Sequence, residues 1–582
     1  MRFVTCVVLT LLVTASSARA FLLDLNGSGS ARHWDLLVTN AAVNTNVVNP
    51  NTRAVRFFLG ANGYSNTNTA AELNAIRAAF AQWQAVPGTH LKFEDAGVVS
   101  PPVDINTSDN RNLVYWSKTT FVNGGFDNIS GALGVTFYKV SGTASHSMLE
   151  ADIVLNGAEY AWYTDYFDPN NTNVFAEAIA LHEIGHLNGL EHTPVGGATL
   201  FYVAAYGLTL QAGLSSDDIG GIRCLYPTAA ASFGAVKGTV TKGVNPVLGA
   251  AVFARNAIGN TVAGTVTAPN GTYLLSTLPP GDYQIRVAPL DPLGAFDYLC
   301  RGADIGDAYT NADTTFLPTT NRSVTVAATI TNTANFSVTA SAPAFRITLI
   351  RPPTTVANAF SWISLPTSLR AGQSNYFIGV VSEDLPASGA TLTITGDGLT
   401  LGTPTFNPNI GGLGLNVISV PISVASNATP GLRDFIVQQG ANIAYASGFF
   451  EVQPIVTDDN FDGLDDVFQR QYFPLFTSAN AAPAADPDAD GMNNLAESIA
   501  GTNPTNAASV LKMLSVTRSG NTATLRWLSG NGKRYQLSYR TNLASGGWSN
   551  LGSVVTASGT NTQFADSTAT NAVRFYRVQA LP

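Results

Sequence analysis

Charged residues and cysteines are scarce in this sequence. Only 12% of the 582 residues are charged, and 30 Lys and Arg against 39 Asp and Glu give a net charge of −9. No run of Lys or Arg stands out against this acidic balance, which excludes a basic nucleic-acid-binding surface. Hydrophobic residues make up 45% of the chain. Such a chain can build folded cores, and disorder driven by high net charge is excluded.

Long apolar runs are also missing. The run Phe3–Val13 is shorter than the ~20 residues that a membrane-spanning helix requires, and no later stretch is long and apolar enough to span. The small-residue pattern at 18–20 follows it, so residues 1–20 are typical of a cleaved signal peptide. We therefore expect a secreted, extracellular protein without a transmembrane segment. Cleavage leaves Cys224 and Cys300, either bridged or as two separate buried thiols, which is too few for a disulfide scaffold.

The distribution of turn residues predicts several domains. With 53 Gly and 29 Pro, turns are frequent, and β-rich modules are favoured over helical bundles. A linker of small residues follows Pro227. We predict a multidomain chain with an α+β head followed by all-β domains. The predicted segments are the signal peptide (1–20), the head (21–230), a β-sandwich (234–340), a second β domain (341–455), a short Asp-rich segment (456–507) and a C-terminal β-sandwich (508–582).

Periodic apolar residues predict the main elements of the head. Apolar side chains at helical spacing predict helices over 70–83 and 174–188, and a shorter one over 217–225. Gly189 stands where a left-handed residue would end the second helix. Strands are predicted at 55–59, 91–93, 113–116 and 151–155.

The chemistry is concentrated in the eleven residues from His182 to His192. His182 and His186 are four residues apart, so on a helix they share one face and can reach a single metal ion. Gly189 allows the chain to leave the helix, which would let His192 return as a third ligand. Three neutral nitrogens with one open position are typical of a catalytic zinc. Glu183, beside the first ligand, can accept a proton from the attacking water as general base.

This stretch resembles the metzincin metalloproteases, and its flanks resemble the matrixin branch. The strand sequence at 151–156 and the closing-helix sequence at 214–226 carry the resemblance, which covers most of residues 35–227. It implies a twisted mixed sheet with an active-site helix. It also implies a zinc endopeptidase that cleaves proteins or peptides, with His182, His186 and His192 as zinc ligands and Glu183 as general base.

The sequence departs from the family pattern at the pocket floor. Family members place a methionine in a tight turn beneath the zinc, yet no Met occurs between Met148 and Met492. Leu200 takes that position, and Leu-to-Met exchanges usually cost below ~1.5 kcal/mol. Tyr202 follows two residues later, where some metzincins supply a tyrosine to the zinc site; a core aromatic is the alternative. No Cys-containing segment of the matrixin type precedes the head, which disfavours latency through a thiolate.

The Asp-rich segment predicts calcium binding. Calcium takes six to eight oxygen ligands, and a twelve-residue loop supplies them at fixed positions around a central Gly. The sequence from Asp486 matches such a loop, and a weaker copy from Asp458 has Gln469 at its last position. The segment resembles dockerin or thrombospondin type 3 repeats; a solvated acidic linker is the alternative. The predicted ligands are Asp486, Asp488, Asp490, Met492 (through its carbonyl), Asn494 and Glu497, and in the weaker copy Asp458, Asn460, Asp462, Leu464 and Asp466.

The remaining modules carry less functional information. Residues 271–283 resemble carboxypeptidase regulatory-like domains, and we expect an immunoglobulin-like fold for 341–455. Aromatic residues near the C-terminus could bind a glycan or a cell surface, although core packing is the commoner role. Two functions remain open: a secreted zinc endopeptidase with a targeting tail, or a non-catalytic adhesion or structural protein with a zinc-binding head.

Overall fold

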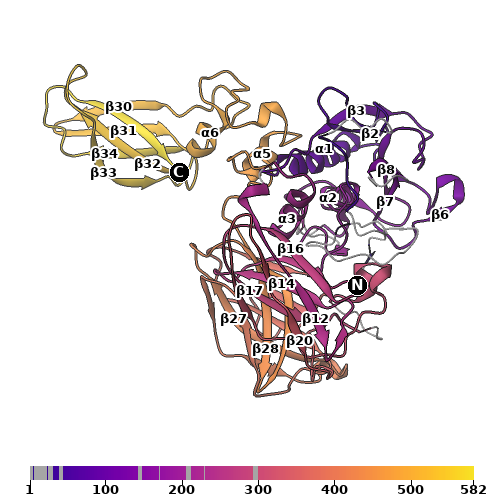
Figure 1. Ribbon diagram of the computed structural model, residues 1–582. Helices are drawn as coiled ribbons and strands as arrows, with labels where there is room; N and C mark the ends of the chain where they lie inside the picture. The colour runs from indigo at the N-terminus through magenta and orange to yellow at the C-terminus, as the bar shows by residue number, and fades with distance from the viewer. Residues whose placement is uncertain are drawn as a thin grey trace. The chain divides into compact units, whose positions relative to one another are not determined.

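The computed structural model describes residues 4–5, 23, 31–37, 43–141, 147–168, 171–204, 211–228, 230–292 and 299–582. The chain divides into two compact units, Met1–Ile455 and Val456–Pro582, and Figure 1 traces both. Of the predicted signal peptide, only strand β1 (Val4–Thr5) is described, and it pairs antiparallel with β11 (Val203–Ala204). No helix in the described part of the chain is long and apolar enough to cross a membrane.

The head is built on a five-stranded mixed sheet of order β3-β2-β4-β8-β7. The first four strands are parallel and β7 joins β8 antiparallel at the edge. The sheet strands are β2 (Val55–Gly60), β3 (Phe93–Val99), β4 (Asn112–Ser117), β7 (Gly134–Val140) and β8 (Met148–Asn156). Shorter strands pair outside it, namely β5 (Phe121–Val122) with β6 (Asp127–Asn128), and β9 (Trp162–Tyr163) with β10 (Val174–Phe175).

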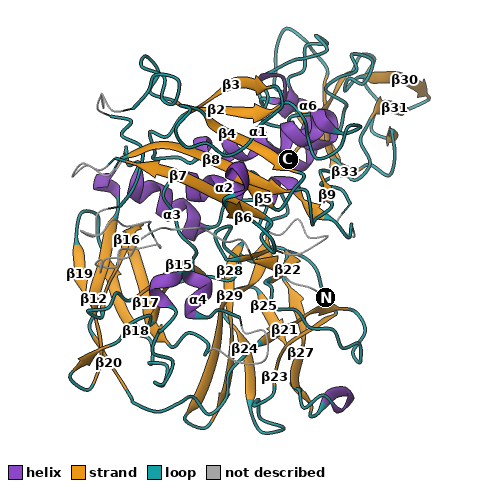
Figure 2. Ribbon diagram, turned by 90° about the vertical axis from the view of Figure 1, so that its right-hand side faces the viewer, coloured by secondary structure: helices purple, strands orange, loops and turns teal. Residues whose placement is uncertain are grey.

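Helices α1 (Thr69–Ala85) and α2 (Ala176–Leu187) cover one face of this sheet, as Figure 2 shows. Alternating side chains of β4 separate the two faces, because successive residues of a strand point in opposite directions. Val114 and Trp116 belong to the core shared with the helices, whereas Leu113 and Tyr115 belong to a smaller core on the other face. Helix α3 (Ser216–Leu225) closes the head. The predicted α+β head is confirmed.

Several boundaries differ from those predicted; β8, for example, begins at Met148 and not at residue 151. Helix α2 begins at Ala176 because residues 174–175 pair with β9 as a short parallel strand. The strand expected at 91–93 begins only at Phe93 and continues to Val99. Leu91, although buried, precedes it in a connecting segment in which Thr89 bridges to Pro227.

Residues 234–338, which we call the first β module, form two packed sheets. Their orders are β13-β12-β16, with β19 and β20 also on β12, and β15-β14-β17-β18. The elements are β12 (Gly234–Lys242), β13 (Asn245–Pro246), β14 (Ala251–Asn256), β15 (Thr261–Val266), β16 (Thr272–Leu278), β17 (Gly281–Ala288), the short helix α4 (Gly302–Ile305), β18 (Arg322–Val326), β19 (Thr331–Thr333) and β20 (Phe336–Val338).

Residues 349–453, the second β module, also form a sandwich. Its sheets have the orders β21-β23-β27-β25, with β26 also on β27, and β22-β29-β28-β24. The strands are β21 (Leu349–Thr354), β22 (Thr367–Arg370), β23 (Tyr376–Ser382), β24 (Thr391–Ile394), β25 (Leu399–Leu401), β26 (Thr405–Asn407), β27 (Asn416–Val424), β28 (Gly431–Gln439) and β29 (Asn442–Gln453).

The head and the two β modules share hydrophobic cores. One core joins head residues such as Ile222 to Val236 and Leu275 of the first β module. Another encloses Val195 and Phe201, from the loop after the last histidine, among residues of both β modules. The two described cysteines lie near these junctions and form no disulfide: Cys224 accepts a hydrogen bond from Ser276, and Cys300 is buried.

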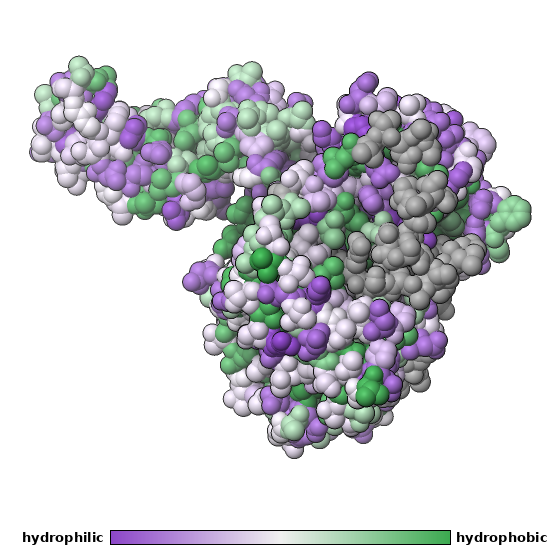
Figure 3. Space-filling view, in the orientation of Figure 1, coloured by the Kyte–Doolittle hydropathy of each residue, from purple (hydrophilic) through white to green (hydrophobic). Residues whose placement is uncertain are grey.

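The second unit starts with the Asp-rich segment, which contains the short helices α5 (Asp466–Tyr472) and α6 (Asn494–Ala500). The C-terminal module has two three-stranded sheets, β30-β31-β34 and β33-β32-β35. Their strands are β30 (Met513–Ser519), β31 (Thr522–Leu528), β32 (Arg534–Arg540), β33 (Ser549–Thr556), β34 (Asn561–Asp566) and β35 (Phe575–Leu581). Polar and apolar residues are interspersed over the face of the molecule in Figure 3.

Candidate active site

Two tryptophans hold the helix that carries the central motif. The indole Nε1 of Trp83, on α1, donates to the carbonyl of Leu181 at 2.9 Å. The indole of Trp34 donates to the carbonyl of Leu187, also at 2.9 Å. Both tryptophans are buried, with at most 1% exposure. Since a buried indole N–H needs a partner, these bonds fix the position of α2 along its axis.

The end of α2 directs the chain back toward its own face. Gly189 has φ +98°, and a Cβ there would lie 2.2 Å from the carbonyl oxygen of Arg32, so only glycine fits. The amide of Gly189 donates to the carbonyl of His186, and the amide of Leu190 to that of Gly185. This pair of bonds is a Schellman motif, the turn expected after Gly-terminated helices. The predicted left-handed stop at Gly189 is confirmed.

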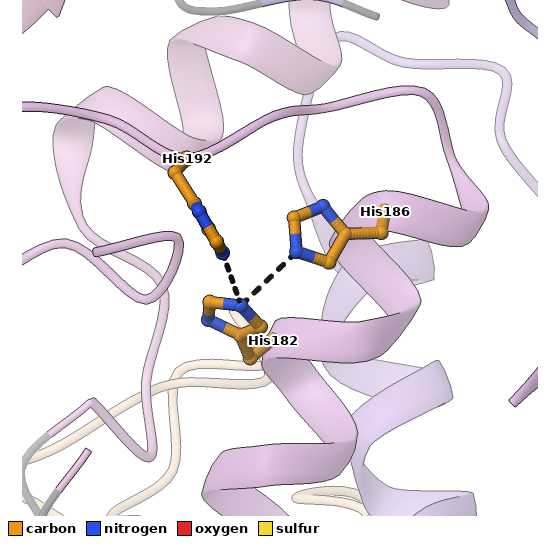
Figure 4. Close-up of side chains that lie close together, drawn as sticks. All are labelled: His182, His186 and His192. Carbon is orange, nitrogen blue, oxygen red and sulfur yellow. Dashed lines mark hydrogen bonds between the residues drawn. The ribbon is translucent and has the colours of Figure 1, made fainter. Parts of the chain in front are cut away.

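The three histidines of the motif converge at one point (Figure 4). The Nε2 atom of His182 lies 3.1 Å from that of His186 and 3.3 Å from that of His192. All three side chains are buried, with exposures of 3–5%. The structure thus brings together the predicted ligands, which come from one helix and the loop that follows it.

Backbone carbonyls set the tautomer of each ring. The Nδ1 atoms of His182, His186 and His192 donate to the carbonyls of Thr199, Leu190 and Asp304 at 2.7, 2.7 and 2.8 Å. A proton on Nδ1 leaves the lone pair on Nε2, so three lone pairs face the same point. Burial lowers the pKa of His182 to about 4 and that of His192 to about 3, and holds the pKa of His186 well below its usual range. The rings are therefore neutral at pH 7, as metal ligands must be.

This donor set fits a zinc ion. Two nitrogens bound to one tetrahedral zinc at 2.0–2.1 Å lie roughly 3.3–3.4 Å apart, close to the 3.1 and 3.3 Å found here. Three imidazoles with a fourth position open are typical of catalytic rather than structural zinc. His182, His186 and His192 would hold the ion.

Glu183, the predicted general base, is tied to the edge strand of the sheet. The hydroxyl of Thr136, on β7, donates to Glu183 Oε2 at 2.7 Å and lies 3.0 Å from the carbonyl oxygen of the same residue. Thr136 and Glu183 are both buried. Gly134 leaves room for the carboxylate, because a Cβ there would lie 2.8 Å from Oε1. β7 therefore both accommodates and orients the Glu183 side chain.

Leu200 packs against α2 at Gly185, which stands between the first two ligands in the sequence. A Cβ at Gly185 would lie 2.6 Å from Leu200 Cδ2, so the glycine permits close contact of the leucine with α2. The carboxylate of Asp218 accepts hydrogen bonds from the amides of Thr199 and Leu200 at 2.9 and 3.1 Å. Asp218 also belongs to the capping box that starts α3. Helix α3 therefore holds the turn that supports the site from below.

Tyr202 lies close to the site but packs as a core aromatic. Its ring centroid is 6.5 Å from that of His192, and its exposure is 4%. It stacks edge-on with Phe201, which in turn contacts Phe449 of the second β module. Burial raises the pKa of the Tyr202 hydroxyl well above its usual range.

The loop from Asp486 gathers four carboxylates. Oxygens of Asp486, Asp488 and Asp490 lie within 4.8 Å of one another. Glu497, on α6, is fully buried, and burial together with these three charges raises its pKa to about 7. The amide nitrogen of Asn494, a predicted ligand, donates to the carbonyls of residues 480 and 482, and its buried side-chain oxygen accepts no hydrogen bond.

The weaker copy from Asp458 folds similarly, but side-chain amides donate to its central carboxylate. In both loops the first aspartate accepts a hydrogen bond from the amide of the central glycine: Gly463 donates to Asp458, and Gly491 donates to Asp486. Gln469, at the last position, donates to the carboxylate of Asp462 at 2.8 Å. Gln469 therefore donates a hydrogen bond to the loop where the stronger copy has the carboxylate of Glu497.

Three functional residues were missed by reasoning from sequence: Thr136, Asp218 and Asp304. The Ser-Ser-Asp-Asp sequence at 215–218, with its capping-box spacing, signals the start of the helix but not the bonds from Asp218 to the turn at 199–200. Thr136 lies on a distant strand. Asp304 contributes through its backbone, which leaves no mark in the sequence.

In this site a mixed sheet packs against a helix that carries two of the three convergent histidines, and a glycine turn leads to the third. This arrangement defines a metzincin-type metal centre. In agreement, residues 52–227 match the family described as matrixin, so the chain contains a matrixin domain, and this family implies a catalytic zinc. Residues 235–290 match the carboxypeptidase regulatory-like domain. The predicted resemblances to these two families are confirmed, whereas the resemblance of the Asp-rich segment to dockerin or thrombospondin type 3 repeats stays a prediction.

Two curated relatives are metalloendoproteinases of plants. The chain is 28% identical over 156 residues to metalloendoproteinase 4-MMP of Arabidopsis thaliana, and 29% identical over 153 residues to metalloendoproteinase 1 of Glycine max. Each match covers 26% of this chain, and 39% and 45% of the relatives, so the chain spans less than half of their length. Among solved structures, the major pilin subunit of Bacillus cereus is 12% identical to this chain, with a TM-score of 0.13. The match covers 38% of this chain and 69% of the pilin, and the likeness is too slight to support an argument.

Proposed function

We propose that this protein is a zinc-dependent endopeptidase that hydrolyses peptide bonds of proteins. The observation that carries the proposal is the convergence of the three Nε2 atoms beside Glu183, within a matrixin domain. The two curated relatives, both metalloendoproteinases, support it. Leu200 fills the place of the family methionine without opening the floor, because it is in close contact with Gly185.

Each residue of the site has a separate part in the proposed reaction. A zinc ion, when bound, supplies Lewis acidity to the substrate carbonyl and to the attacking water. Glu183 accepts the proton of that water and passes it to the leaving amine. Thr136 orients Glu183, and the carbonyls that accept from the Nδ1 atoms hold the three imidazoles in place.

Removal and return of zinc test this proposal. The full chain, freed of metal with a chelator, should lose cleavage of casein or of a fluorogenic peptide and regain it with one equivalent of zinc. A His186→Ala variant serves as matched control, since zinc should not restore it. Cleavage that survives chelation, or a purified protein that binds zinc without cleaving any peptide in a library, would overturn the endopeptidase and favour a non-catalytic zinc-binding head.

We further propose that the protein is secreted. The basic, apolar and small-residue pattern of residues 1–20 supports this proposal. N-terminal sequencing of protein from the culture medium should begin near residue 21. A cell-retained chain that still begins at residue 1 would contradict it. Glycan or cell-surface binding by the tail stays a prediction.

We propose a structural calcium ion at the loop from Asp486. The support is electrostatic: a fully buried carboxylate at Glu497 faces three aspartates, and a divalent cation would neutralise this repulsion. The loop is joined to the C-terminal module, because the hydroxyl of Tyr535 donates to the carbonyl of Ala500 at the end of α6. Order imposed by the ion would therefore extend to that module. The loop from Asp458, whose predicted ligands include Asn460, is the weaker candidate.

The pH dependence of the calcium effect tests this site. Without calcium, the raised pKa of Glu497 means that the folded state binds its proton more tightly than the unfolded state. Stability is then lost as pH rises from about 4.5 to about 7, by at most ~3 kcal/mol. Calcium should restore it at pH 7, and Glu497→Gln should remove both the loss and the response. Calcium that leaves the unfolding of the wild-type chain unchanged at pH 7 would contradict the site.

A further inference from the structure

The third zinc ligand is held by a different domain from the other two. His192 Nδ1 donates to the carbonyl of Asp304, 112 residues later, in helix α4 of the first β module. The corresponding acceptors for His182 and His186 are carbonyls of the head itself, at Thr199 and Leu190. One of the three rings thus donates its Nδ1 hydrogen to a residue of the first β module.

The turn that presents this carbonyl is braced on both sides. The carboxylate of Asp304 accepts from the Arg301 amide at 2.8 Å and from its guanidinium at 2.9 and 2.7 Å. A Cβ at Gly302 would lie 1.9 Å from the carbonyl oxygen of Tyr309, so the turn is closely packed. Asp304 is 5% exposed. The bonds to Arg301 and the close packing at Gly302 therefore fix the position of the Asp304 carbonyl independently of His192.

Further contacts hold the head against the β modules around the site. Asp217 Oδ1 accepts from the amide of Gly264 on β15 at 2.7 Å. The amide of Gly196, four residues after the third histidine, donates to the carbonyl of Ser447 on β29 at 3.0 Å. A Cβ at Gly196 would lie 2.5 Å from the ring of Phe449, so the two surfaces are in direct contact there. The loop after His192 is thereby packed against both β modules.

We propose that the first β module completes the zinc site: the Asp304 carbonyl is a positioning group that fixes the tautomer and orientation of His192. The inference rests on the proposed zinc centre and extends it to a residue outside the matrixin domain. A carbonyl that accepts from Nδ1 keeps the lone pair on Nε2 and restricts rotation of the ring. Without it, His192 would be a weaker and less directed ligand, and the tail would govern metal loading of the head.

Variants of the bracing turn in the full chain test this role. Asp304→Ala removes the bonds to Arg301, and Gly302→Ala displaces the turn through Tyr309; both should weaken zinc binding about tenfold in competition with a chelator. Asp304→Asn, which keeps one acceptor for Arg301, should stay closer to wild type. Asp282→Ala is the matched control: its carboxylate belongs to the same module and accepts from Thr325, but it lies on strand β17 and not in helix α4.

A spectroscopic readout separates positioning from folding. Cobalt(II) in the site should show d–d absorption bands that shift or broaden in Asp304→Ala and Gly302→Ala but not in Asp282→Ala, while thermal unfolding of the variants shows that they remain folded. Unchanged zinc affinity and unchanged cobalt spectra in both folded variants would overturn the inference and leave the proposed function standing. A wild-type chain that binds neither metal would overturn the zinc centre itself.

Discussion

The pocket floor offers the sharpest mutational prediction. Leu200 is 2% exposed and lies against Gly185, between the helical ligands. Leu200→Ala leaves a cavity beneath α2, and buried Leu-to-Ala changes cost about 2–5 kcal/mol. The neighbouring carbonyl of Thr199 accepts from His182 Nδ1. We therefore expect the cavity to loosen the first ligand as well as to destabilise the head.

Two measurements on the full chain check this prediction. Denaturant unfolding should show the loss of stability, and chelator competition should show zinc binding weakened by about tenfold. Leu200→Met is the matched control, since it keeps the volume and restores the family residue. It should lower the free energy of unfolding by less than ~1.5 kcal/mol and leave zinc affinity unchanged. An alanine variant with wild-type stability and zinc affinity would refute the reasoning that Leu200 supports the ligands.

Two further predictions concern buried polar groups. Thr136→Val keeps the shape of the side chain but removes the hydroxyl that donates to the Glu183 carboxylate. We expect the free energy of unfolding to fall by about 1–3 kcal/mol and kcat to fall at similar KM. An unchanged kcat would contradict the orienting role of Thr136. Burial raises the pKa of Asp217 to about 8, so its folded-state proton is held more tightly than in the unfolded chain and stability falls as pH rises from about 4 to 8. Asp217→Asn should flatten this fall in stability, which amounts to about 1.4 kcal/mol for each unit of pKa shift. A variant whose unfolding free energy varies with pH as in the wild type would contradict this prediction.

The convergence of the three histidines could be predicted from sequence because their spacing is local. The four-residue spacing of His182 and His186 defines one helix face, and Gly189 signals the turn that brings back His192. Leu200 could be placed because the flanking motifs align it with the family turn. Local periodicity also predicted the helices of the head to within two residues at each end.

What escaped prediction depends on contacts between distant segments. Thr136 reaches Glu183 because β7 is the edge strand beside α2, an arrangement that emerges only from the sheet order. The Asp304 carbonyl reaches His192 through the packing of two domains, and a backbone acceptor has no residue preference to reveal it. The strand expected at 91–93 failed for a related reason: Leu91 is apolar because it enters the core, not because it pairs in the sheet.

The central claim is that Glu183 acts as the base beside a zinc held by three histidines. Glu183→Gln keeps the size of the side chain and an acceptor for Thr136 but cannot take up the proton. The most direct test is to measure zinc content and cleavage of a fluorogenic peptide on the same preparation of this variant. The account predicts one zinc per chain and a loss of cleavage of at least about 10²-fold. Zinc-loaded Glu183→Gln protein that cleaves at the wild-type rate would contradict it.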